Sequence, residues 1–380
     1  MMRFKLGPLS ILLAMIVTTG FSAVPTGLDM KLMKTVTQGL GENQAISPFV
    51  MSTLMTQVWL GARGATRREM TPVLGLSRSA PRDFLRTYRS AIDYIAKGSS
   101  KVITGVFNRM YIRRGFSIKP TFKRLLTIYY RASARTFSSA SQAAKEINTD
   151  VAAVTRDRIK KLVAPAALMR AELVLVSALY FKGVWKYTFD TAKKASFLTE
   201  SGEKQVDMMH LKETKLPYAY MKTYEAVALP YTDEDYGMLV IIPSRRSMAA
   251  VKALRNSIDS INIANIIKHL KPMSISVSMP RFKIKTSYEL SSAMERLGIR
   301  KIFGMSADFS GITDGTLFVS NIIHKVFIEV TEKGTEAAGA GAVIFTKSLP
   351  PHLVADRPFF AVVYNKKHNL SLFSAFVSSP

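Results

Sequence analysis

The sequence contains no cysteine among its 380 residues, which excludes disulfide bonds, thiol nucleophiles and cysteine-based metal sites. It has five histidines, and no two lie at the spacing of a paired metal-ligand motif such as HxxxH. The phosphate-binding patterns GxxxxGK(S/T) and GxGxxG are missing, and so is the GxSxG serine elbow. With no recognisable catalytic, metal or cofactor motif, we predict that the chain is not an enzyme and binds no metal.

Acidic residues are also scarce, with 27 Asp and Glu against 53 Lys and Arg, which gives a formal net charge of +26. A charge of this size favours polyanionic partners such as nucleic acid, glycosaminoglycan or an anionic membrane surface. The alternative is a solvated basic surface without a specific site. Composition alone does not choose between the two.

Long apolar runs are confined to the N-terminus. Residues 1–23 start with basic side chains, continue with an apolar run and end with small residues, which is typical of a secretory signal peptide. The run is short for a bilayer span, so we prefer this interpretation to an uncleaved membrane anchor. We therefore predict a secreted, extracellular protein whose mature domain is residues 24–380. The sequon Asn369-Leu370-Ser371 predicts a glycosylation site, although a lone sequon often goes unused.

Apolar periodicity predicts helices early in the chain and strands later. Helical spacing indicates helices at 28–40, 43–62, 81–97, 143–162 and 287–297. Strand-like segments are 101–112, 171–185, 224–231, 236–243, 274–285, 316–334 and 359–377, the last with a hairpin tip at NKKHN. No composition change marks a later domain boundary, so we predict one α+β domain with large antiparallel sheets.

The segment TEAAGAGAVIFT, residues 335–346, joins a run of very small residues to a strand-forming end. As an extended strand, its first half would place no bulky side chain on either face, so two neighbouring strands would not block its insertion between them. The backbone hydrogen bonds gained would be worth on the order of 10 kcal/mol, at about 1 kcal/mol each. A flexible Gly/Ala connector is the alternative, but it does not account for the VIFT end.

The stretch EKGTEAAGAGA resembles the hinge of the serpins, and other segments resemble that family in the same order. They are ISPFVMSTLMTQVWLGARGATRREM (46–70), LVLVSALYFKGVWKYTFD (173–190), VDMMHLKE (206–213), LPY (229–231), SVSMPRFKI (276–284), LGIRKIF (297–303), ADFSGIT (307–313), HKVFIEV (324–330) and DRPFFAVV (356–363). The resemblance implies the serpin fold, with helices packed on large antiparallel and mixed sheets and an exposed reactive-centre loop. It also implies a monomeric suicide inhibitor, which traps a serine protease covalently when the cleaved loop inserts into the main sheet.

The resemblance also assigns the residues of the loop. The hinge residues would be Glu332, Gly334, Thr335, Glu336, Ala337, Ala338, Gly339 and Ala340. Counting back from DRPFF places the reactive bond at Lys347-Ser348, whereas counting forward from Glu332 places it at Ser348-Leu349. We choose Lys347-Ser348, because lysine suits the acidic primary pocket of trypsin-like proteases. The alternative is that Lys347 is only a solvated loop charge.

Beneath the sheet opening, the sequence departs from the family pattern. The resemblance implies a breach tryptophan at Trp185 and a shutter built from Ser47, Ser177 and His324. The family usually has serine at position 50 and asparagine at position 177, where this chain has Val50 and Ser177. The change removes polar partners from a buried network, so we expect His324 to bond differently, with Ser177 as a candidate partner. A non-inhibitory serpin that binds or carries a ligand is therefore the alternative function.

Residues 81–97 match the helix that binds glycosaminoglycans in some serpins. The candidate contacts for a heparin-like cofactor are Arg82, Arg86, Arg89, Lys97, Arg113 and Arg114. Nucleic acid is disfavoured as a partner for a chain predicted to be secreted. A generally basic surface is the alternative, and a polyanion-binding structural protein would leave the hinge unexplained.

Overall fold

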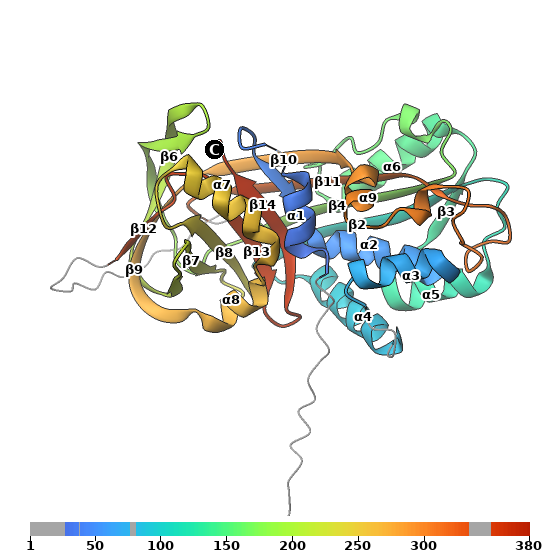
Figure 1. Cartoon of the computed structure of the whole chain (residues 1–380), viewed down its shortest axis with the longest axis horizontal. Coiled ribbons are helices and arrows are strands. Elements are labelled where there is room, and N and C mark those ends of the chain that lie inside the picture. Colours follow the sequence, from blue (N-terminus) through green and yellow to red (C-terminus); the bar gives the residue numbers. More distant parts are fainter. Residues whose placement is uncertain (1–26, 38, 77–80, 334–350) are drawn as a thin grey trace, which may run out of the picture.

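A computed structural model describes residues 27–37, 39–76, 81–333 and 351–380. The helices are α1 (Asp29–Val36), α2 (Pro48–Gly61), α3 (Gly64–Val73), α4 (Pro81–Lys97), α5 (Pro120–Tyr130), α6 (Ala140–Val154), α7 (Met248–Ser257), α8 (Ile263–His269) and α9 (Ser291–Arg296), with short 3₁₀ turns η1 (Pro165–Leu168), η2 (Ile258–Ser260) and η3 (Lys301–Phe303) (Figure 1). The strands are β1 (Gln44–Ile46), β2 (Val102–Arg113), β3 (Ala134–Phe137), β4 (Leu173–Gly183), β5 (Asp190–Thr199), β6 (Gly202–Tyr220), β7 (Tyr224–Pro230), β8 (Tyr236–Pro243), β9 (Lys271–Pro280), β10 (Phe282–Glu289), β11 (Val319–Val330), β12 (His352–Val354), β13 (Phe359–Asn365) and β14 (Leu370–Val377). Within these ranges, no helix combines the length and the apolar character needed to cross a membrane.

The described strands form two sheets. One runs β10-β11-β4-β2-β3, and its central neighbours β4 and β11 are parallel and hydrogen-bonded directly to each other. The other runs β1-β14-β13-β8-β7-β6-β9-β12, with β5 attached to β6. The predicted fold of helices packed on large antiparallel and mixed sheets is therefore confirmed.

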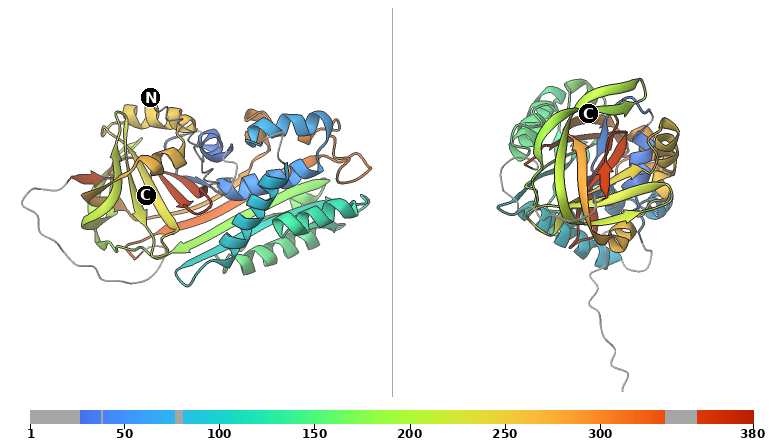
Figure 2. Two further views of the ribbon diagram at one scale, coloured as in Figure 1. Left: turned by 90° about the horizontal axis from the view of Figure 1, so that it is seen from below. Right: turned by 90° about the vertical axis from the view of Figure 1, so that its left-hand side faces the viewer.

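Strand β4 is buried on both of its faces, which explains its nearly continuous apolar sequence. One set of alternating side chains joins the main core that contains α2: Leu173, Leu175, Leu179 and Phe181. The other set joins a second core beneath α6: Val174, Val176, Ala178 and Tyr180. The long sheet therefore has helices on both of its faces (Figure 2).

Two predicted helices have clear local causes. Ser47 caps α2, since its side chain accepts a hydrogen bond from the Val50 N–H, and Pro48 occupies the first helical position. All residues of α2 are buried, in agreement with its apolar sequence. The amphipathic helix α4 has the predicted bounds, 81–97.

Several predictions have the wrong bounds. The predicted helix 43–62 begins with a strand, since residues 44–46 form β1, and the predicted helix 287–297 begins only at residue 291, after β10. The predicted helix 143–162 is α6, which ends at residue 154 because the Thr155 hydroxyl accepts from the Ile159 N–H at 3.1 Å and the next residues turn to positive φ. The predicted strand 274–285 is two strands, β9 and β10, which belong to different sheets. The Arg281 N–H makes the last bond to β6, at the Asp207 carbonyl, and β10 then pairs with β11.

Candidate functional site

The C-terminal end of β11 is fastened where the predicted hinge begins. The Glu332 carboxylate accepts hydrogen bonds from the Ala192 N–H at 3.0 Å and from Arg281 Nε at 2.8 Å. The Glu332 carbonyl accepts from the Phe189 N–H at 3.0 Å. Burial alone would raise the pKa of Glu332, but the hydrogen bonds from Arg281 and Ala192 lower it below its usual value. Glu332 therefore links three chain segments as an ionised carboxylate.

Trp185 lies beside this junction and is almost fully buried. Its indole Nε1 donates to the Thr331 carbonyl at 3.0 Å, and its ring stacks on Tyr231 with centroids 4.4 Å apart. Trp185 thus holds the backbone of the residue before Glu332. Together, Trp185 and Glu332 hold the C-terminal end of β11 in place. We call this pair of residues the breach.

Near the middle of β11 lies a second buried cluster, which we call the shutter. It consists of Ser47, Ser177 and His324. His324 Nε2 accepts a hydrogen bond from the Ser47 backbone N–H at 3.0 Å, so the proton of the neutral ring lies on Nδ1. Nδ1 lies 2.8 Å from Ser177 Oγ and donates to it. Ser177 Oγ in turn lies 3.4 Å from the Met51 sulfur. Burial lowers the pKa of His324 to about 3, which keeps the ring neutral.

The shutter clamps the two parallel strands to each other. Ser177 on β4 and His324 on β11 are direct register partners, and both are fully buried. Ser47 Oγ also donates to the Leu372 carbonyl at 2.6 Å, which fixes the start of α2 to β14. At position 50, only the backbone takes part, because the Val50 carbonyl accepts from Asn108 Nδ2 at 3.2 Å.

The reactive loop lies outside the described residues. So do Gly334, Thr335, Glu336, Ala337, Ala338, Gly339, Ala340, Lys347 and Ser348, and so does the predicted signal peptide, 1–23. The description resumes with Pro351 and β12, which pairs in parallel with β9. The two ends of the loop therefore start from ordered positions: the breach on one side and an edge strand on the other.

The six cations of the predicted polyanion site differ in their availability. Arg89 bonds Asp93 Oδ2 at 2.7 Å and the Thr127 and Ile128 carbonyls at the end of α5. Arg113 bonds the carbonyls of residues 168, 169 and 171. Both guanidinium groups are thus occupied by internal acceptors. The remaining members are Arg86, Lys97 and Arg114, which are exposed, and Arg82, whose side chain lies outside the description.

A family profile described as Serpin (serine protease inhibitor) matches residues 25–380. The chain is a serpin. Leukocyte elastase inhibitor of Sus scrofa is 32% identical over 357 residues, which are 89% of this chain and 93% of that protein. Serpin B6 of Pongo abelii is 29% identical over 92% of this chain and 97% of that protein. Among solved structures, native protease nexin-1 with heparin matches with a TM-score of 0.82 and 26% identity, over 94% of this chain and 98% of that one.

The predicted location of the protein is corrected by these relatives. The sequence predicts a secreted, extracellular protein, whereas Serpin B6 and leukocyte elastase inhibitor are intracellular serpins of clade B that lack signal peptides. The prediction of secretion rested on the composition of residues 1–23 alone. A local pattern of charge and apolar side chains does not specify the compartment of a serpin.

Sequence reasoning missed several residues that hold the site together. Arg281, Ala192, Tyr231 and Asn108 all contact the breach or the shutter. Arg281 lies inside the segment SVSMPRFKI, but a single cation between two strands carries no periodic signal. Its contact with Glu332 spans 51 residues and depends on how the strands pair.

Proposed function

We propose that this serpin inhibits trypsin-like serine proteases as a suicide substrate, with Lys347-Ser348 as the reactive bond. The protease attacks the lysyl carbonyl and forms an acyl-enzyme, and Ser348 becomes the new N-terminus of the released peptide. The loop then inserts between β4 and β11 before water hydrolyses the acyl bond. The serpin itself supplies a cleavable bond and a fold that relaxes, but no catalytic side chain.

The parallel pairing of β4 with β11 is the observation that carries this proposal. The loop leaves from the end of β11, so a strand that turns back between β4 and β11 runs antiparallel to both. Both of its edges then gain backbone partners, which is the favoured outcome for a strand's N–H and C=O groups. The small residues from Ala337 to Ala342 meet two neighbours whose side chains already fill the cores on both faces.

The choice of protease class is supported by Lys347. A trypsin-like primary pocket presents an aspartate to the side chain before the scissile bond, and lysine satisfies it. Cleavage at Ser348-Leu349 would place a serine in that pocket instead. The two positions are distinguished by the first residue of the released peptide.

Mixing the full chain with trypsin, followed by a denaturing gel and sequencing of the released peptide, tests the proposal. We expect an adduct that survives heat and detergent, together with a peptide that starts at Ser348. The matched variant Thr335→Arg should be cleaved without forming the adduct, because a long charged side chain cannot enter the buried sheet. Cleavage of the unmodified chain without an adduct would refute inhibition of trypsin and favour the non-inhibitory, ligand-carrying alternative.

We also propose a sulfated polysaccharide as a cofactor that binds the exposed cations of α4. Arg86 and Lys97 support this proposal, since no hydrogen bond or ion pair holds either side chain within the described residues. Heparin chromatography tests it: the double variant Arg86→Gln/Lys97→Gln should elute at lower salt than Lys252→Gln, a control on α7. Equal elution of the two variants would mean that the overall charge, and not α4, causes retention.

A further inference from the structure

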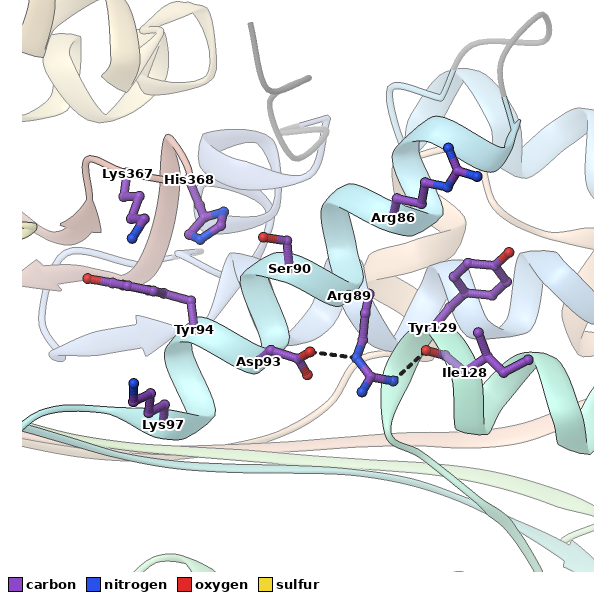
Figure 3. Close-up of a pocket in the computed structure, with 10 residues that line it drawn as sticks. All are labelled: Arg86, Arg89, Ser90, Asp93, Tyr94, Lys97, Ile128, Tyr129, Lys367 and His368. Atoms are coloured by element: carbon purple, nitrogen blue, oxygen red, sulfur yellow. Dashed lines mark hydrogen bonds and ion pairs between the residues drawn. The ribbon is translucent and has the colours of Figure 1, made fainter. Parts of the chain in front are cut away.

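A hollow of about 730 Å³ lies between α4, the C-terminal end of α5 and the turn that joins β13 to β14, and we call it the α4 pocket (Figure 3). This volume falls in the range of sites for small molecules. The pocket belongs neither to the breach nor to the shutter, and loop insertion does not use it, although it shares Arg86 and Lys97 with the proposed polysaccharide site.

Its walls are fixed to one another by contacts within the protein. Arg89 joins α4 to the end of α5 through the Thr127 and Ile128 carbonyls. Tyr94 donates its hydroxyl proton to Asp235, whose carbonyl accepts from the Lys366 N–H at 2.7 Å. The third wall, at the turn after β13, is thereby fastened to α4. The hollow is therefore formed in advance and does not depend on a ligand for its shape.

One end of the α4 pocket is cationic. Figure 3 shows Lys97, Lys367 and His368 grouped around Tyr94. Lys367 Nζ lies 4.3 Å from the centre of the Tyr94 ring, and no carboxylate within the described residues pairs with Lys97 or Lys367. His368 is only 8% exposed, and its Nε2 has no hydrogen-bond partner among the described residues. A buried polar atom without a partner is costly, and an acceptor in the pocket would satisfy it once Nε2 carries a proton.

In the middle of the pocket, two arginines share one carboxylate. The carboxylate is that of Asp93, which pairs with Arg89 at 2.7 Å and with Arg131 at 2.5 Å. Asp93 therefore does not neutralise Lys97 or Lys367. At the Tyr94 end, Lys97 and Lys367 outnumber Asp235, the carboxylate that accepts from Tyr94, so the net charge there is positive.

The other end is apolar and aromatic. Tyr129 and Ile128 line it, next to Arg86 (Figure 3). Ile128 is 43% exposed, which makes it one of the few large hydrophobic side chains that are exposed in the described part of the chain. An exposed isoleucine offers nothing to a fully hydrated polysaccharide, but it favours a ligand with an apolar body.

We propose that the α4 pocket binds a small aromatic organic anion, such as an aryl sulfonate, carboxylate or phosphate ester. The acidic group meets the charged amines of Lys97 and Lys367, where charge-assisted hydrogen bonds are available, and the Nε2–H of a neutral His368. The flat ring extends along α4 toward Ile128 and Tyr129. Such a ligand uses both ends of the pocket, whereas inorganic sulfate uses only one.

Isothermal titration calorimetry of the full chain with naphthalene-1-sulfonate tests the proposal. We expect one site per chain, and about tenfold weaker binding in Lys97→Gln and in Lys367→Gln, the loss expected for one contact to a charged group. Lys252→Gln on α7 should bind as the unmodified chain does. Ile128→Asn should weaken the binding of naphthalene-1-sulfonate while leaving any binding of inorganic sulfate unchanged.

Three outcomes would overturn the proposal. The first is equal affinity for naphthalene-1-sulfonate in Lys367→Gln, Lys97→Gln and Lys252→Gln. The second is equal affinity of the unmodified chain for neutral naphthalene-1-methanol, which would remove the role of the cations. The third is binding of a heparin hexasaccharide that depends on Lys97 and Lys367 without any binding of naphthalene-1-sulfonate, which would make the surface a polyanion site. Each variant should first show the thermal unfolding midpoint of the unmodified chain.

Discussion

The hydrogen bond between Ser177 and His324 holds together the two strands that loop insertion must separate. The residues are register partners on β4 and β11, and Ser177 Oγ lies 2.8 Å from His324 Nδ1. A strand that enters between β4 and β11 must break this contact. The variant Ser177→Ala should therefore weaken the closed sheet, and with it the barrier to insertion of an uncleaved loop.

The size of the effect follows from burial. Both side chains are fully buried, so the variant leaves the Nδ1–H of His324 without a partner, at a cost of about 2 kcal/mol. If the contact is completely broken in the transition state of insertion, that free energy corresponds to a rate increase of up to about thirtyfold. The same loss should appear as a lower free energy of unfolding.

The assay is the half-life of trypsin inhibition by the uncleaved chain at 37 °C, measured beside the urea unfolding midpoint. Ser374→Ala is the matched control: Ser374 is equally buried, but its hydroxyl contacts only the Met30 sulfur at 3.7 Å and lies on β14. We expect a shorter half-life in Ser177→Ala and little change in Ser374→Ala. A half-life of Ser177→Ala within twofold of the unmodified chain would refute the assignment of the shutter contact as a barrier to insertion.

Three further predictions concern buried charges and the breach. Glu332→Ala should lower the free energy of unfolding by about 1–2 kcal/mol, and a double-mutant cycle with Arg281→Gln in urea should show coupling; additive losses would mean that the ion pair contributes nothing. Burial raises the pKa of Asp29 from 3.8 to about 7 against the opposing hydrogen bond from Ser371. The native state then keeps a proton that the unfolded chain releases, so the stabilisation is complete below about pH 4 and is lost as pH rises to about 7. This loss of unfolding free energy, about 2–4 kcal/mol in total, should be absent when urea midpoints of Asp29→Asn are measured against pH. An unchanged pH dependence in the variant would contradict the assignment. The pH dependence from His324 runs in the opposite direction, because burial lowers its pKa from 6.5 to about 3. Its contribution to stability is present above pH 6.5 and is lost as pH falls toward 3. The variant His324→Gln should therefore lose less stability in acid than the unmodified chain in the same urea series, and an equal loss would exclude His324 as its origin.

Local sequence patterns were sufficient where one element carries its own signal. The helix α4 has a proline at its start and an amphipathic period, and its predicted and observed bounds agree. The helix α2 has a capping serine and an apolar sequence on all sides, which identified it as buried. Helices α3, α5, α7 and α8 were missed, and each of them buries only two or three side chains.

The predicted polyanion stripe shows the limit of such patterns. Arg86 and Arg89 lie three residues apart on one helix, and the sequence does not distinguish them. In the fold, the end of α5 lies within reach of Arg89 and presents carbonyl groups to it, while Arg86 remains exposed. Whether a cation is available to a ligand is decided by the neighbouring element.

By itself, the sequence determined the family, the α+β class and the small-residue segment after β11, because periodicity, propensity and side-chain size are properties of consecutive residues. Only the tertiary structure decided which groups meet. The pairing of Ser177 with His324 joins positions 147 residues apart, and the α4 pocket joins two helices to the turn after β13. Contacts of this kind depend on sheet register and on the burial of whole elements. Both are set by the free energy of the complete chain, so they leave no pattern in any one segment of the sequence.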